Sequence, residues 1–227
     1  MKRFLMTGFE PFGGQKINPS WQAVQGVTAP EGVELIKREL PVRWYDTSAA
    51  VKDLIEELQP DAILLTGQAG GAERIRVERV GLNLRDAGSA DNAGVVVRDT
   101  PVFPGAPAAY FSTFAYKDIL SALTGASLPA AYSFSAGAYL CNEALYTALH
   151  LLPEAKCGFI HLPFLPEQSE KHFTLPLDKQ ILALQLALTA QAAAMRSFQA
   201  SPVHGEVART ARRRGCPHLL SQGGIRP

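Results

Sequence analysis

Cys141 is the residue whose setting most clearly suggests nucleophilic chemistry. It follows a run of small residues in SAGAYLCNEALY (135–146), where a segment with a helical pattern begins. The positive end of a helix dipole and its unpaired backbone N–H groups favour a thiolate and make a cysteine a better nucleophile. The alternative is that Cys141 is a small apolar packing residue, as most free cysteines are.

His161 and Glu78 are candidates for the groups that would activate such a thiol. His161 lies among apolar neighbours in GFIHLPF, at the end of a predicted strand. It is either a base for the thiol, which needs a partner to orient its other ring nitrogen, or a core histidine with one satisfied hydrogen bond. Glu78 is either that partner or part of a solvated strand face shared with Arg74 and Arg76. Since a Cys–His–acid triad can be assembled from distant segments in any chain order, the three residues are compatible with one.

Two further segments have features of a ligand site. Phe9 and Phe12, in FEPF, follow the first predicted strand, and open α/β sheets bind ligands at the carboxyl ends of strands. Their rings could equally just close a core. The turn GQAGGA (67–72) lacks the G-x-G-x-x-G spacing and a Walker lysine, which argues against phosphate binding. Its glycines still permit close approach of a ligand to the backbone.

The elements that must position these residues follow an α/β pattern. Short apolar runs alternate with helical patterns, which predicts a largely parallel sheet. Residues 93–103 suggest an excursion or a hairpin. Strands are predicted over 3–9, 33–40, 61–67, 74–84, 130–135 and 156–164, and helices over 18–27, 47–59, 114–124, 141–152 and 177–198.

The predicted strand 74–84 has an irregularity beside Glu78. Ile75 and Val77 share one face of this strand, whereas Val80 and Leu82 have the other parity. We expect a β-bulge at positions 78–79, and bulges often redirect side chains beside active sites.

Composition limits the functions that are possible. The 227 residues are 47% apolar and 19% charged, with a net charge of +1, as in a globular protein without a global signature of nucleic-acid binding. The spacing of the three cysteines (141, 157 and 216) fits neither a disulfide framework nor a zinc site. The sequence begins without a signal-peptide h-region, and its most apolar stretch (181–195) is too short to span a bilayer. We therefore expect a cytoplasmic protein with no nucleic-acid or membrane partner.

The last 27 residues differ in composition from the rest. Residues 201–227 contain five arginines against one glutamate, a net charge of +4, and show little periodicity. We expect one domain over 1–200 and a basic, poorly packed C-terminal tail over 201–227.

Four segments together resemble the signatures of the pyroglutamyl peptidase I (pyrrolidone-carboxylate peptidase) family of cytosolic cysteine peptidases. They are TGFEPFGG…NPSW, GQAGG…ERVGLN, SAGAYLCNEALY and GFIHLPFLPEQ. The resemblance runs from Lys2 to about Gln168 and extends through the closing helix to residue 198. It implies a Cys141–His161–Glu78 triad, a three-layer α/β/α sandwich around a twisted, largely parallel open sheet, no cofactor or metal, and assembly as a homodimer or homotetramer.

The resemblance also implies a substrate, an N-terminal pyroglutamyl peptide. The lactam ring is neutral, so its pocket should be mostly apolar with a few placed hydrogen bonds. Phe9 and Phe12 can sandwich the ring, the turn at Gln68 can offer backbone groups, and Asn18 is a further polar contact by resemblance. Two alternatives remain, a non-catalytic ligand binder on the same scaffold and a cysteine amidase for another small lactam or acyl group.

Two positions depart from the family pattern. The family usually has Ser or Thr two residues before the glutamate of the triad, where this chain has Arg76. It usually has an arginine ten residues after that glutamate, where this chain has Gly88. We consider that Arg85 could send its side chain to the same place.

Overall fold

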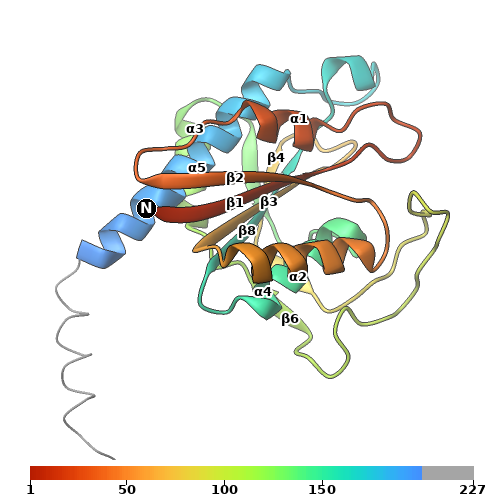
Figure 1. Ribbon diagram of the computed structural model, residues 1–227. Helices are drawn as coiled ribbons and strands as arrows, with labels where there is room; N and C mark the ends of the chain where they lie inside the picture. The colour runs from red at the N-terminus through yellow and green to blue at the C-terminus, as the bar shows by residue number, and fades with distance from the viewer. Residues whose placement is uncertain (201–227) are drawn as a thin grey trace, which may run out of the picture. The chain divides into compact units, whose positions relative to one another are not determined.

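The chain folds around one six-stranded sheet (Figure 1). The structure is a computed structural model that describes residues 1–200; the tail expected over 201–227 lies outside the described residues. The six strands have the order β2-β1-β3-β8-β4-β7, and all neighbours are parallel except β4 and β8. The predicted α/β class is therefore confirmed, with a mixed, mostly parallel sheet. The strands are β1 (Lys2–Phe9), β2 (Val33–Leu40), β3 (Ala62–Gln68), β4 (Ile75–Glu78), β5 (Val80–Leu82), β6 (Ala109–Phe111), β7 (Ala130–Ser133) and β8 (Lys156–Leu162).

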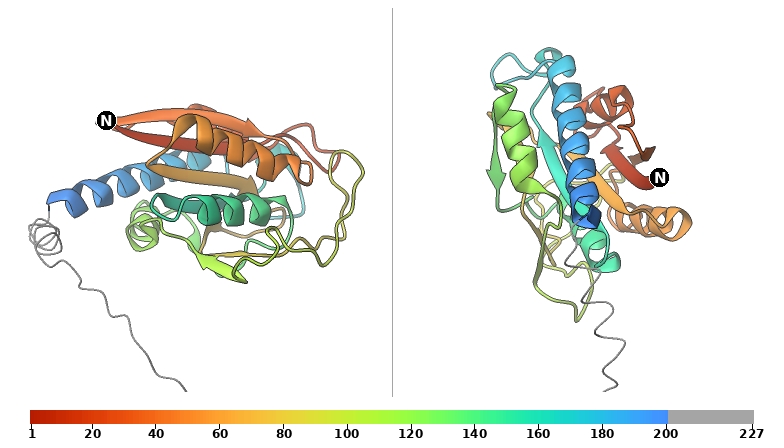
Figure 2. Two further views of the ribbon diagram at one scale, coloured as in Figure 1. Left: turned by 60° about the horizontal axis from the view of Figure 1, so that its bottom comes forward. Right: turned by 90° about the vertical axis from the view of Figure 1, so that its left-hand side faces the viewer.

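Helices cover both faces of this sheet within the compact unit Met1–Ala192. Helices α2 and α4 pack together on one face, and α1, α3 and α5 lie on the other (Figures 1 and 2). On that second face Gly26 of α1 lies against Ile181 of α5, and the Ala115 N–H before α3 donates to Gln191 of α5 at 2.7 Å. The helices are α1 (Pro19–Gly26), α2 (Asp46–Leu58), α3 (Tyr116–Gly125), α4 (Leu140–Leu151) and α5 (Leu177–Ala200), and a short 3-10 helix spans Pro166–Gln168.

Along the central strands, successive side chains point to opposite faces of the sheet and pack against different helices. On β8, Cys157 and Phe159 belong to the apolar cluster shared with α2 and α4, whereas Gly158 lies against Phe114 on the opposite face. His161 has the same parity as Phe159, so its side chain points to the α4 side of the sheet. The candidate site therefore develops on that side.

The strand predicted over 74–84 is divided by Arg79, and this differs from the expected bulge. β4 belongs to the main sheet and ends at Glu78, after which β5 pairs with β6 in a separate two-stranded sheet. The change in parity thus marks a switch between sheets. The short strand β6 was not predicted, and the described structure of 93–103 contains only an isolated bridge between Arg85 and Thr100 in place of a hairpin.

Helix α1 shows how the loop after β1 is closed locally. Asn18 is its N-cap, with the side chain accepting from the Ser20 N–H at 3.0 Å, and Pro19 occupies the first turn, where it needs no hydrogen-bond partner for its nitrogen. Among residues 1–200, no helix is long and apolar enough to cross a membrane.

Candidate active site

Register across the sheet places three residues of the site in one row. Gly67 on β3 pairs with His161 on β8, and His161 pairs with Arg76 on β4. Residues directly opposite each other on adjacent strands send their side chains to the same face. The α4 side of the sheet therefore carries Gly67, His161 and Arg76 in that order, with successive strands about 4.8 Å apart.

Glu78 lies two residues after Arg76 on the same face of β4. Its Oε1 is 2.8 Å from Nδ1 of His161, and Glu78 and His161 are 1% and 6% exposed. Because Glu78 pairs with Phe159, Glu78 is the diagonal neighbour of His161. Diagonal neighbours are close enough for the carboxylate and the imidazole to make contact. With Nδ1 bonded to the carboxylate, Nε2 is the nitrogen left to face the thiol.

The pKa of His161 is strongly shifted by its surroundings. Burial disfavours the imidazolium and by itself lowers the pKa, but the charge and hydrogen bond of Cys141, followed by those of Glu78, outweigh burial and raise the pKa from 6.5 to about 9. The ring is therefore protonated at neutral pH and can serve as a proton donor.

Cys141 lies in the first turn of α4, the helix that packs on this face of β3 and β8. A Cβ built on Gly67 would lie only 2.8 Å from Cys141 Sγ, so the thiol rests against the β3 backbone at that glycine. The N-cap, Tyr139, makes no side-chain cap hydrogen bond, and the first backbone N–H groups of a helix lack intrahelical partners. These groups are available to an oxyanion formed at the thiol.

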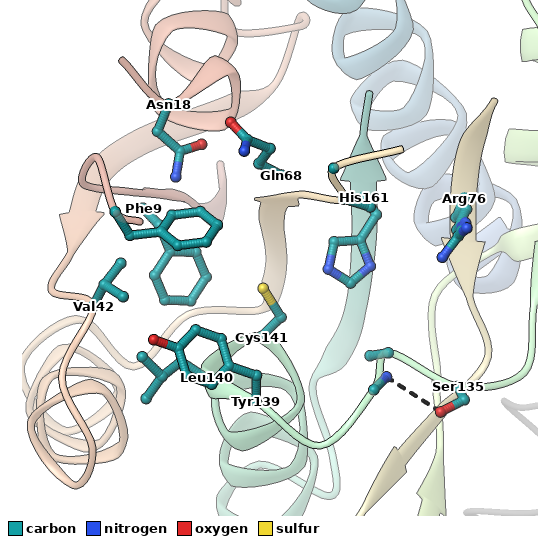
Figure 3. Close-up of a pocket in the computed structure, with 15 residues that line it drawn as sticks. Phe9, Asn18, Val42, Gln68, Arg76, Ser135, Tyr139, Leu140, Cys141 and His161 are labelled. Carbon is teal, nitrogen blue, oxygen red and sulfur yellow. Dashed lines mark hydrogen bonds between the residues drawn. The ribbon is translucent and has the colours of Figure 1, made fainter. Parts of the chain in front are cut away.

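A cavity of about 440 Å³ opens at this thiol (Figure 3). Figure 3 shows Cys141 between the ring of Phe9 on one side and the imidazole of His161 on the other, with Arg76 beyond His161. The part of the cavity on the Phe9 side of Cys141 is mostly apolar with a few amides, as a small neutral ligand requires. It is lined by Phe9, Phe12, Asn18, Val42, Gln68 and Tyr139.

Hydrogen bonds hold the turn that carries Phe9 and Phe12. Glu10 Oε1 accepts from the Val42 N–H and from Asn92 Nδ2, both at 2.9 Å, and Asn92 also donates to the Pro11 carbonyl. The ends of β1 and β2 and the loop containing Asn92 are thus tied together at one carboxylate. Phe9 is buried, whereas Phe12 is half-buried.

Asn18 and Gln68 have different freedom to bind a ligand. Asn18 Oδ1 accepts from both Ser20 N and Oγ, and its Nδ2 donates to the Glu10 carbonyl at 3.0 Å, so most of its capacity is used within the fold. Gln68 Oε1 accepts from Gln168 at 2.8 Å. Its Nε2 has no hydrogen-bond partner among the described residues and is available as a donor.

The structure brings all seven residues singled out from the sequence to this region. Six of them line the cavity, and Glu78 lies behind His161. Val42 and Tyr139 also line it and were missed. Val42 follows the carboxyl end of β2, which is the signal that could have found it.

Arg85 does not replace a cavity arginine. It is buried, it binds Glu143 of α4 at 2.7 Å and the Pro101 carbonyl at 2.7 Å, and it is absent from the cavity lining. Its role is to fasten the loop after β5 to α4. The alternative for Glu78, a solvated strand face, is also wrong, because its side chain is buried.

Cys157, unlike the half-buried Cys141, lies fully inside the fold. Its side chain is completely buried on β8, and Sγ lies 3.7 Å from the Ala148 carbonyl. Burial raises the pKa of Cys157 to about 12, so it stays a neutral thiol. Among the described residues, no group of His, Cys, Asp and Glu is arranged to hold a metal ion.

Comparison with known proteins gives a consistent set of relatives. A family model described as pyroglutamyl peptidase matches residues 2–196. The chain is 50% identical over 172 residues to a pyrrolidone-carboxylate peptidase of Thermococcus onnurineus, covering 74% of this chain and 86% of the relative. It is 40% identical over 198 residues to that of Yersinia pestis, covering 83% and 92%. The crystal structure of Bacillus amyloliquefaciens pyroglutamyl peptidase I is similar with a TM-score of 0.82 at 35% identity, covering 85% of this chain and 98% of that one.

Proposed function

The chain belongs to the pyroglutamyl peptidase family, and from this premise we propose that it removes the N-terminal pyroglutamyl residue of peptides with Cys141 as nucleophile, His161 as acid and base, and Glu78 as the group that orients His161. The observation that carries the assignment of roles is the 2.8 Å contact between Glu78 and His161 Nδ1, beside a thiol at the start of α4.

The first half of the reaction forms an acyl-enzyme. The Cys141 thiolate attacks the carbonyl carbon that joins pyroglutamate to the next residue, and the carbonyl oxygen becomes an oxyanion stabilised by N–H groups in the first turn of α4. As the tetrahedral intermediate collapses, the C–N bond breaks and His161 gives its proton to the leaving amine. Glu78 keeps Nδ1 occupied, so the proton is delivered from Nε2.

The second half releases the product. Water attacks the thioester while neutral His161 takes one of its protons, and the C–S bond breaks to give free pyroglutamate. The thiolate and the imidazolium are restored together. Glu78 stabilises the charged ring in both halves through its hydrogen bond to Nδ1.

The pocket beside Phe9 supports a preference for a lactam. The rings of Phe9 and Phe12 offer flat apolar surface, and Gln68 Nε2 can donate to the lactam carbonyl. A prolyl group has the same ring size but lacks that carbonyl, and its ring nitrogen is charged at neutral pH. It would leave the Gln68 donor unpaired and place a charge in an apolar site, and both effects are costly.

A comparison of two chromogenic amides tests the function. We expect hydrolysis of the pyroglutamyl amide, loss of activity after thiol alkylation, and a far lower kcat/KM for the matching prolyl amide. His161→Ala should abolish turnover while circular dichroism shows an intact fold. Equal efficiency on the two amides would contradict the lactam pocket, and turnover by His161→Ala at the wild-type rate would contradict the assigned roles.

We also propose that the chain assembles as a homodimer or homotetramer, as the resemblance to its family implies. Sedimentation equilibrium of the full chain measures this directly. A monomer at all concentrations would contradict it.

A further inference from the structure

The order of strands arranges the residues of the site in a line that runs from β1 to β4. Phe9 is on β1, the Cys141 thiol rests on β3, His161 is on β8 and Arg76 is on β4, and these strands are neighbours in that order. Our inference rests on the proposed function, in which the pyroglutamyl ring lies on the β1 side of the thiol. His161 must then protonate the leaving amine, so the leaving peptide passes over β8 toward β4. Figure 3 shows Arg76 on this far side of His161.

A second cavity continues in this direction. It has a volume of about 460 Å³ and shares Arg76 with the first. Its wall carries Arg74 and Arg76 against a single acidic residue, Glu73, and also includes Phe134, whose side chain is 69% exposed. The cavity is therefore open to solvent and has a net positive charge.

Arg76 is free to bind a ligand. Its side chain is exposed, and within residues 1–200 neither Arg74 nor Arg76 has an ion-pair partner within 4 Å. Because Arg76 is directly opposite His161 in the sheet, the Cα atoms of the two residues are about 5 Å apart. The Arg76 side chain can therefore reach the residue that follows the scissile bond. A guanidinium binds carboxylates in a two-point geometry that a neutral side chain cannot reproduce.

We propose that Arg76, supported by Arg74, forms a subsite for a carboxylate on the residue that follows pyroglutamate, so that this enzyme prefers leaving groups with a negative charge at that position. The carboxylate comes either from an acidic side chain or from the free C-terminus of a dipeptide. Both sources present the same chemistry to the guanidinium, and Arg76 acts as a specificity-determining residue.

Two matched pairs of substrates separate the sources. Pyroglutamyl-glutamate amide against pyroglutamyl-glutamine amide tests a side-chain carboxylate, and pyroglutamyl-alanine against its C-terminal amide tests a terminal one. In at least one pair we expect kcat/KM for the carboxylate substrate to be higher by roughly three- to five-fold, the effect of one partly exposed ion pair. This ratio should fall toward one from about 0.01 M to about 1 M salt, where the Debye length drops from about 30 to about 3 Å.

Two variants assign the effect to Arg76. Arg76→Gln should bring the ratio close to one, whereas Lys117→Gln, which removes the same charge from the exposed surface of α3, should retain it. Wild-type ratios of one in both pairs, or a ratio that persists in Arg76→Gln, would overturn the proposal. Hydrolysis of a neutral chromogenic pyroglutamyl amide, measured in parallel with the wild type, reports the proposed function separately, so the failure of one is distinguishable from the failure of the other.

Discussion

The thiol of Cys141 lies against the backbone of Gly67, the β3 residue that pairs with His161. A Cβ at position 67 would be 2.8 Å from Cys141 Sγ and 2.9 Å from Phe159 Cζ. Real Cβ atoms essentially never come that close to other heavy atoms. The absence of a side chain at Gly67 therefore sets the position of the nucleophile relative to His161.

Gly67→Ala should consequently displace the thiol. We expect kcat/KM on a pyroglutamyl amide to fall by about 100-fold, because small misplacements of reacting groups have effects of this size. Overpacking should also lower the free energy of unfolding by about 1–3 kcal/mol, measured by denaturant titration. Gly125→Ala is the matched control, since a Cβ there meets nothing within 4 Å. Wild-type kcat/KM in Gly67→Ala would show that the glycine does not position the thiol.

The high pKa of His161 predicts the alkaline limb of the pH profile. The imidazolium is the acid that protonates the leaving amine, so kcat/KM should decline as the pH rises through about 9, where the ring loses its proton. In Glu78→Gln the amide oxygen can still accept from Nδ1, but the Glu78 charge, which adds to that of Cys141 in raising the pKa of His161, is gone. The limb should therefore move to lower pH, with a smaller loss of rate near neutral pH than in His161→Ala. A limb that stays near its wild-type position would contradict the electrostatic role of Glu78.

Local pattern predicted most of the fold and offered Cys141, His161 and Glu78 as candidates, whereas their assignment as a triad and the contact of Asn18 came from the resemblance to the family. The strand predicted over 33–40 is β2 to the residue, and the positions of Cys141 at a helix start and His161 near a strand end follow from neighbouring residues alone. The environment of Glu78 could not be read in this way. Its burial depends on β4 lying antiparallel to β8, a long-range pairing that no local period encodes. For the same reason the change of parity at Arg79 indicated an irregularity but not the switch to a second sheet.

Phe12 offers a test of the ring pocket. Its half-buried ring lines the cavity 6.4 Å from the ring of Tyr139, so truncation removes apolar contact without opening the core. Phe12→Ala should lower kcat/KM for pyroglutamyl amides by the equivalent of about 1–3 kcal/mol in transition-state binding. Phe111→Ala, at a ring that is 70% exposed on β6, should leave kcat/KM unchanged. Equal kinetics in the two variants would mean that the lactam does not contact Phe12.

The central claim, that Cys141 carries the acyl group, is tested most directly by trapping it. An activated pyroglutamyl ester acylates quickly, so acid quenching during turnover and peptide mapping by mass spectrometry should find one pyroglutamyl group on the peptide that contains Cys141. Cys157, which is buried with its pKa raised to about 12, should remain unmodified, and Cys141→Ala should show neither label nor turnover. Turnover without label at Cys141, or a pyroglutamyl group on another residue, would contradict the account.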